Sequence, residues 1–102
     1  MSKKNKTTMQ QPNDVDVTYI NEHAEKVYNG LGVDDIVNRF TTLEEHLAAA
    51  NVYHKYMKKA YAENRLEEGH RLSLLLYRTR EHALNKLDNK SRVRFMAAWK
   101  ID

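Results

Sequence analysis

The sequence predicts an all-α fold, a small helical bundle built on a long antiparallel helical hairpin (about 43–63 and 66–87) with shorter flanking helices. Three Gly and one Pro in 102 residues are too few for an all-β domain, which needs a turn about every 8–12 residues. Apolar residues recur instead at steps of three and four, the period of an α-helix. A capping pattern near residue 64 separates two such long segments, and this corner predicts the hairpin.

The N-terminal part of the chain divides into a tail and a first helix. Residues 1–15 are predicted to form a disordered basic tail, because they are polar and show no apolar period. Residues 16–102 have the length of one helical domain. The first helix is expected to begin near Asp16 or Thr18, which are capping residue types. It is expected to end at Gly30 and Gly32, since Gly accepts the left-handed conformation that closes helices.

Two interpretations of the segment 34–63 remain open. In the first, a short helix over about 34–40 is followed by a new helix near Leu43, because Thr41 and Thr42 each have a glutamate three residues further on. In the second, a single bent helix runs through the whole segment, because the apolar rhythm continues without a break.

The second half of the chain predicts the corner, a long helix and a short last helix. Asn64 is expected to cap the helix 66–87, with Glu67 completing the capping box. Gly69 lies inside that helix, which predicts close approach of a neighbouring helix's backbone. Antiparallel pairing about the corner places residue i near residue 129 − i, so Arg80, on the apolar side, faces Ala49, within about one turn of Glu45. We therefore expect Arg80 to pair with Glu45. Asp88 is expected to cap the last helix, 89–100.

The charges are distributed unevenly along the chain. Residues 15–51 carry two basic and seven acidic side chains, whereas residues 52–102 carry twelve basic and six acidic ones. In one interpretation the two halves pack together and their charges complement each other. In the other, the basic half faces an acidic partner such as nucleic acid.

The residue types argue against an enzyme, a metalloprotein and a membrane protein. The chain has no Cys and no Gly-x-Ser-x-Gly or phosphate-binding Gly motif. Its five histidines include no pair four residues apart, the helical spacing of zinc ligands, so neither a metal nor another cofactor is expected. No apolar run approaches the roughly 18 residues of a membrane span, and no signal sequence is evident, so we expect a cytoplasmic protein.

Two sets of residues are candidates for contact with a partner. Basic side chains are the candidates for nucleic-acid binding, because Lys and Arg contact phosphates. Apolar and aromatic side chains beside them are the candidates for a protein interface or for base stacking. The first set is Arg71, Arg78, Lys90, Arg92 and Arg94, and the second is Leu74, Leu75, Phe95 and Trp99.

These features predict a small non-enzymatic regulatory or accessory protein. Its basic C-terminal half would contact an acidic partner, namely nucleic acid or a protein of a nucleic-acid-handling complex. The alternative is a protein–protein adaptor or a self-assembling structural protein, with a second copy of the chain as partner. The compact, cysteine-free and charge-rich composition would suit an accessory protein encoded by a phage or mobile element.

Overall fold

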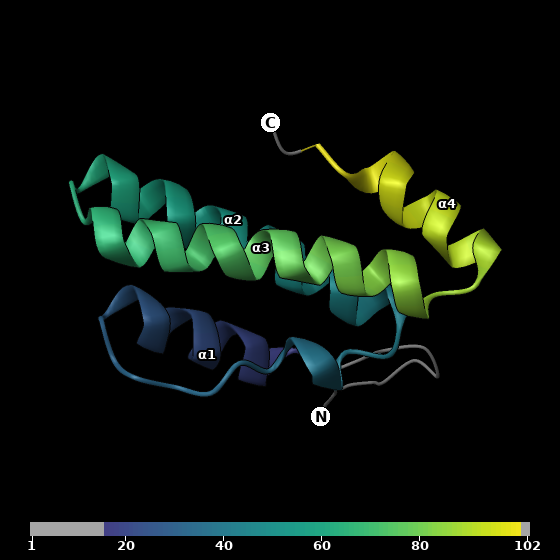
Figure 1. Ribbon diagram of the computed structural model, residues 1–102, viewed down its shortest axis with the longest axis horizontal. Helices are drawn as coiled ribbons and strands as arrows, with labels where there is room; N and C mark the ends of the chain where they lie inside the picture. The colour runs from purple at the N-terminus through teal and green to yellow at the C-terminus, as the bar shows by residue number, and fades with distance from the viewer. Residues whose placement is uncertain (1–15, 101–102) are drawn as a thin grey trace, which may run out of the picture.

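The computed structural model describes residues 16–100, and the predicted basic tail, 1–15, lies outside the described residues. Within that range the chain forms four α-helices and one short 3-10 helix, with no strand (Figure 1). The helices α2 (Leu43–Ala62) and α3 (Leu66–Lys86) form the antiparallel hairpin. The predicted all-α hairpin bundle is therefore confirmed.

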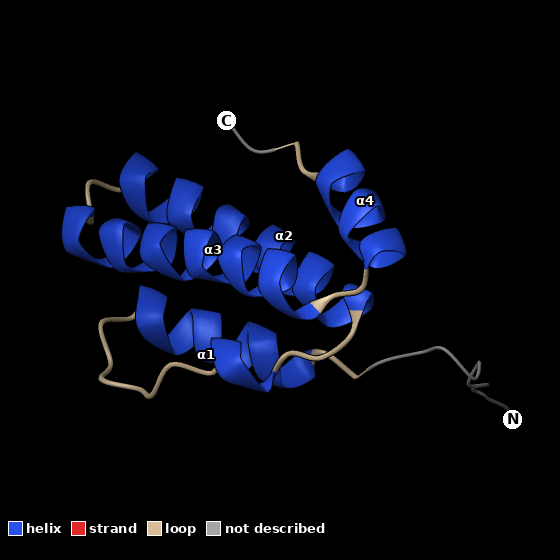
Figure 2. Cartoon of the chain, turned by 45° about the vertical axis from the view of Figure 1, so that its right-hand side comes forward, coloured by secondary structure: helices blue, strands red, loops and turns tan. Residues whose placement is uncertain are grey.

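The first helix, α1 (Thr18–Tyr28), packs along one side of the hairpin (Figures 1 and 2). Asp16 accepts a hydrogen bond from the backbone N–H of Thr18 (2.9 Å), so it helps to begin the helix. Gly30 ends it with φ +81°, and the next N–H, from Leu31, bonds back to the Lys26 carbonyl (2.9 Å). This is the left-handed closure that the glycine predicted.

The segment between α1 and α2 differs from the short helix expected over 34–40. Only η1 (Val37–Arg39) is helical, and it is a single 3-10 turn. Asp35 accepts a hydrogen bond from the backbone N–H of Val37 (2.8 Å), which begins the turn. Phe40 then has extended backbone (φ −71°, ψ 132°), and its buried side chain packs into the core. The segment is therefore mostly loop and brings the Phe40 side chain into the core. The expectation of a short helix over 34–40 is wrong.

The start of α2 decides between the two interpretations of residues 34–63. Thr42 and Glu45 form a complete capping box, in which the Thr42 hydroxyl accepts from the Glu45 N–H (3.0 Å). A separate helix therefore begins at Leu43. Glu45 also accepts a hydrogen bond from the Tyr19 hydroxyl (3.0 Å), so the same carboxylate connects α2 to α1.

The corner of the hairpin lies where the sequence predicted it, but Asn64 has a different role. Asn64 has φ +64° and follows the end of α2, whereas Arg65 occupies the N-cap position of α3 without a side-chain cap. The N–H of Asn64 bonds to the Tyr61 carbonyl (3.0 Å), and the N–H of Arg65 bonds to the Ala60 carbonyl (2.8 Å). This pair of bonds is the Schellman closure of a helix C-terminus. The expectation that Asn64 caps α3 is therefore wrong.

Gly69 and Arg80 on α3 each meet an aromatic side chain. A Cβ on Gly69 would lie 2.6 Å from Tyr61 Cε1, so the glycine makes room for this ring from α2, rather than for the backbone of a neighbouring helix as the sequence predicted. Arg80 does not pair with Glu45, whose carboxylate is engaged by the capping box and Tyr19. Its guanidinium lies 5.7 Å from the centre of the Trp99 ring, a cation–π contact that needs no carboxylate.

The last helix, α4 (Asn89–Ala98), begins at Asp88, whose carboxylate accepts a hydrogen bond from the Ser91 N–H (2.8 Å) as predicted. It ends two residues before the expected limit of 100. It crosses the hairpin away from α1 and contacts α2 and α3 (Figure 2).

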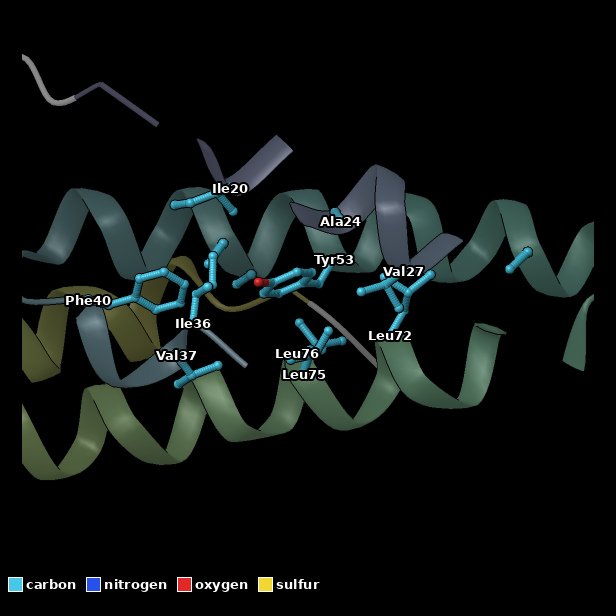
Figure 3. Packing of buried hydrophobic residues seen from close by; sticks show 13 residues of the cluster. Ile20, Ala24, Val27, Ile36, Val37, Phe40, Tyr53, Leu72, Leu75 and Leu76 are labelled. Carbon is cyan, nitrogen blue, oxygen red and sulfur yellow. The ribbon is translucent and has the colours of Figure 1, made fainter. Parts of the chain in front are cut away.

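The core lies between the hairpin, α1 and η1, with Tyr53 near its centre (Figure 3). The Tyr53 side chain is fully buried, and its hydroxyl lies 2.9 Å from His23 Nδ1. The other ring nitrogen, Nε2, lies 2.7 Å from the Asp34 carbonyl oxygen. In the neutral ring Nε2–H donates to that carbonyl and Nδ1 accepts from Tyr53, so each buried polar atom of this chain of contacts is satisfied.

Candidate functional site

The structure distributes the nine candidate residues over two sides of the hairpin. One group faces α1 and the loop 31–36, on one side of α3. The other group belongs to α4 and the residue that follows it, on the other side (Figures 1 and 2). The first group is Arg71, Leu74, Leu75 and Arg78, and the second is Lys90, Arg92, Arg94, Phe95 and Trp99. The two groups therefore define two surfaces with different chemistry.

The first surface is an open groove of about 410 Å³ between α1, the loop 31–36 and α3, which we name the α1–α3 groove. Leu75 is almost covered and belongs to its floor together with Val27. Three apolar side chains remain exposed at the groove, namely Leu31 (54%), Val33 (37%) and Leu74 (53%). The groove is thus apolar within and open to solvent.

Two arginines line the same groove, and both already have carboxylate partners. Arg78 Nε lies 2.7 Å from Asp35 Oδ2, and an Arg71 guanidinium nitrogen lies 2.9 Å from Glu67 Oε2. All four side chains are well exposed, with fractions between 38% and 72%. Such pairs are usually worth about 1 kcal/mol or less, so they hold the arginines loosely.

The second surface is carried by α4, and its aromatic residues face inward. Phe95 is fully buried beside Ala83 and Leu87, and Trp99 packs on its ring (centroids 5.6 Å apart) and on Tyr77 (6.2 Å). Phe95 therefore belongs to the core of the bundle and presents no exposed ring for base stacking. Trp99 is partly buried and is occupied by Arg80 on one face.

The outward side of α4 is basic and partly apolar. Residues 89–100 contain four basic and no acidic side chains. One of them, Arg92, is tied down, since it donates to the Leu84 carbonyl (3.1 Å) and to the Asn89 side chain. Lys90 and Arg94 lie one turn apart and are exposed, with the 70% exposed Val93 between them. Among residues 16–100, neither Lys90 nor Arg94 forms an ion pair.

An open polar cavity of about 460 Å³ adjoins this side of α4 at the open end of the hairpin. Lys86 from α3 and Arg94 from α4 both line it, as do the hydroxyl-bearing Thr41 and Ser91. We name Lys86, Lys90 and Arg94 the basic cluster.

Two carboxylates, Glu44 and Asp88, also line the cavity. The Ser91 N–H, followed by the charges of Lys90 and Arg92, lowers the pKa of Asp88, so this carboxylate stays ionised and offsets part of the positive charge.

The structure also brings together a pair of histidines that the sequence interpretation missed. His46 is fully buried; its Nδ1 lies 2.7 Å from the Thr42 carbonyl oxygen and its Nε2 lies 2.9 Å from His82 Nδ1. Nδ1–H of His46 therefore donates to Thr42, and Nδ1–H of His82 donates to His46. Burial lowers the pKa of both rings, and for His82 the neighbouring His46 adds to the effect.

The histidine pair has a signal in the sequence, because the antiparallel register of 129 − i places residue 46 beside residue 83. The pair lies where α2 and α3 meet, between Phe40 and Phe95, whose rings contact His46 edge-on. Within residues 16–100 no group of three or more His, Cys, Asp or Glu side chains is arranged to hold a metal ion. The hydrogen bond between the two rings links α2 to α3.

Comparison with known proteins adds no assignment. The chain matches no protein-family model, no curated protein sequence and no solved structure. Within residues 16–100, no helix has the length and apolar character needed to cross a membrane.

Proposed function

We propose that this chain is a small non-enzymatic accessory protein that binds nucleic acid through the basic cluster of Lys86, Lys90 and Arg94. The observation that carries the proposal is the convergence of these cations at one end of the molecule. Two of them line one open polar cavity, and among residues 16–100 none of the three is in an ion pair. Arg71 and Arg78 lie on the other side of α3 and are ion-paired, so they are not part of this site.

The groups around the basic cluster suit a phosphate backbone. Lysine, arginine and hydroxyl side chains make most of the phosphate contacts in protein–nucleic acid complexes, and Thr41 and Ser91 supply hydroxyls beside Lys86 and Arg94. Phe95 is buried and Trp99 is partly covered, so base stacking contributes little. The proposed binding is therefore directed at phosphates, with little sequence preference.

The proposal predicts a defined salt dependence. Each neutralised phosphate releases counterions, and the logarithm of the binding constant falls with the logarithm of salt concentration with a slope of about −0.9 per contact on duplex DNA. Three contacts from the basic cluster give a slope of roughly −3. A leucine-centred protein interface would not show this dependence.

The test compares two triple variants that remove the same charge from opposite ends of the hairpin. The first is Lys86→Gln/Lys90→Gln/Arg94→Gln, and the matched control is Lys55→Gln/Lys58→Gln/Lys59→Gln on the exposed side of α2. Binding of labelled duplex DNA and RNA is measured by fluorescence anisotropy over a series of salt concentrations, and the melting temperature is measured on the same samples.

We expect the cluster variant to lose nearly all of the salt slope and the control to keep most of it, with both variants folded. Equal loss in the two variants would mean that binding follows net charge alone. Absence of binding by the parent protein at low salt would remove the proposed function.

A further inference from the structure

We infer that the α1–α3 groove docks an amphipathic helix of a partner protein, with apolar side chains in the groove and two carboxylates seven residues apart on Arg71 and Arg78. This surface is separate from the basic cluster, so the inference does not depend on nucleic-acid binding. It gives the adaptor function a defined place on the molecule.

The apolar contribution comes from side chains that the fold leaves exposed on one concave surface. Leu31, Val33 and Leu74 are between 37% and 54% exposed, although they come from a loop and a helix 40 residues apart in sequence. Exposed apolar side chains scattered singly need no explanation, but several that converge on one groove are typical of an interaction site.

The spacing of the two arginines identifies the kind of partner. Arg71 and Arg78 are seven residues apart, which is about 10.5 Å along α3 and almost the same direction around its axis. Leu74 lies between them. On a second helix, positions i and i+7 have the same rise, with positions i+3 and i+4 between them on the same face. Carboxylates at i and i+7 and leucines at i+3 and i+4 therefore match the arginines and the groove together.

The charge of the groove favours a carboxylate-bearing partner. Its lining contains two arginines and one acidic residue, Asp35, whereas Glu67 lies outside the lining. The pairs that Arg71 and Arg78 form in the free protein are well exposed, and exchange of such pairs costs little. A partner carboxylate can therefore take the place of Glu67 on Arg71. A second can bind Arg78 beside Asp35, which still accepts the Val37 N–H (2.8 Å).

The experiment uses two synthetic helical peptides of the same length. In one, glutamates at i and i+7 flank leucines at i+3 and i+4; in the other, lysines replace these glutamates. Fluorescence anisotropy of the labelled peptides measures their affinity for the parent protein. We expect the glutamate peptide to bind about tenfold or more tightly than the lysine peptide, the scale on which charged contacts at an interface discriminate between partners.

Three protein variants make the result specific to the groove. Leu74→Ser should weaken the glutamate peptide about tenfold, whereas Leu66→Ser, which changes an exposed leucine of α3 outside the groove, should leave the affinity unchanged. Arg71→Glu/Arg78→Glu should reverse the preference between the two peptides. Thermal melting confirms that each variant is folded. Neutralising the basic cluster should not affect peptide binding, which separates this test from the one for nucleic acid.

Three outcomes would overturn the inference. The first is no binding of the glutamate peptide by the parent protein at millimolar concentration. The second is equal weakening by Leu66→Ser and Leu74→Ser. The third is self-association of the parent that Leu74→Ser abolishes in analytical ultracentrifugation, because a second copy of the chain would then be the occupant of the groove.

Discussion

Removal of His82 alone should destabilise the protein more than removal of both histidines of the pair. In His82→Leu, Nε2 of the fully buried His46 loses its donor, and an unpaired buried acceptor costs about 1–3 kcal/mol. In His46→Leu/His82→Leu both polar groups are gone, and the Thr42 carbonyl still accepts the backbone N–H of residue 46 (3.1 Å). Replacement of both partners by apolar groups is often nearly neutral. The double variant should therefore be more stable than His82→Leu.

The same pair makes the stability depend on pH with a defined sign. Burial lowers the pKa of both rings in the folded protein, below the value of about 6.5 expected in the unfolded chain. The unfolded chain then binds more protons than the folded one, so stability is complete above about pH 6.5 and falls as the pH decreases below it. Each pKa unit between the two states is worth about 1.4 kcal/mol.

Urea denaturation followed by circular dichroism measures both effects. The parent, the two single variants and the double variant are compared above and below about pH 6.5. A double variant no more stable than His82→Leu at the higher pH would contradict the cost of the unpaired His46 nitrogen. A double variant that acid destabilises as steeply as the parent would contradict the role of the two rings in the pH dependence.

Two further variants test the local structure of the hairpin. Asn64→Gly should raise the free energy of unfolding, and Asn64→Ala should lower it by about 1 kcal/mol, because φ is +64° at this residue. Urea denaturation measures both values, and a lower free energy of unfolding in both variants would indicate a side-chain cap instead. Burial alone would raise the pKa of Glu45, but the N–H groups of Thr41 and Thr42 and the Tyr19 hydroxyl lower it to about 2. This contribution to stability is present above about pH 4.5 and is lost as the pH falls towards about 2. In Glu45→Gln, the melting temperature should therefore fall less steeply between these pH values. The same fall in the variant and the parent would contradict the role of Glu45.

Local signals predicted most of the fold. The capping residues Thr42 and Asp88 and the corner near residue 64 determine where the helices begin and end, and each acts through neighbours within a few residues in sequence. Asn64 shows the limit of such signals. An asparagine followed three residues later by a glutamate fits a capping box, but asparagine also tolerates the left-handed conformation, and only the backbone of the corner distinguishes the two.

The site was harder to predict because it depends on which side of α3 each neighbour covers. The 129 − i register brings Arg80 close to Glu45, but the sequence does not show that Tyr19 and the capping box already engage that carboxylate. Nor does it show that the five basic candidates lie on two separate surfaces. The loop 31–36 meets Arg71 and Arg78, whereas α4 turns away from them, and both arrangements arise from packing over long distances in sequence.

Among the described residues, the two flanks of the hairpin do not touch each other. The helices α1 and α4 each pack on α2 and α3, and within residues 16–100 they make no contact with one another. Proteins open in local cooperative units whose free energies differ, so α1 and α4 are expected to open independently while the hairpin stays closed. A ligand on α4 would slow amide hydrogen exchange there and leave exchange in α1 unchanged. The free energies of binding at the two surfaces would then be additive. One copy of the chain could hold two partners at once without cooperativity.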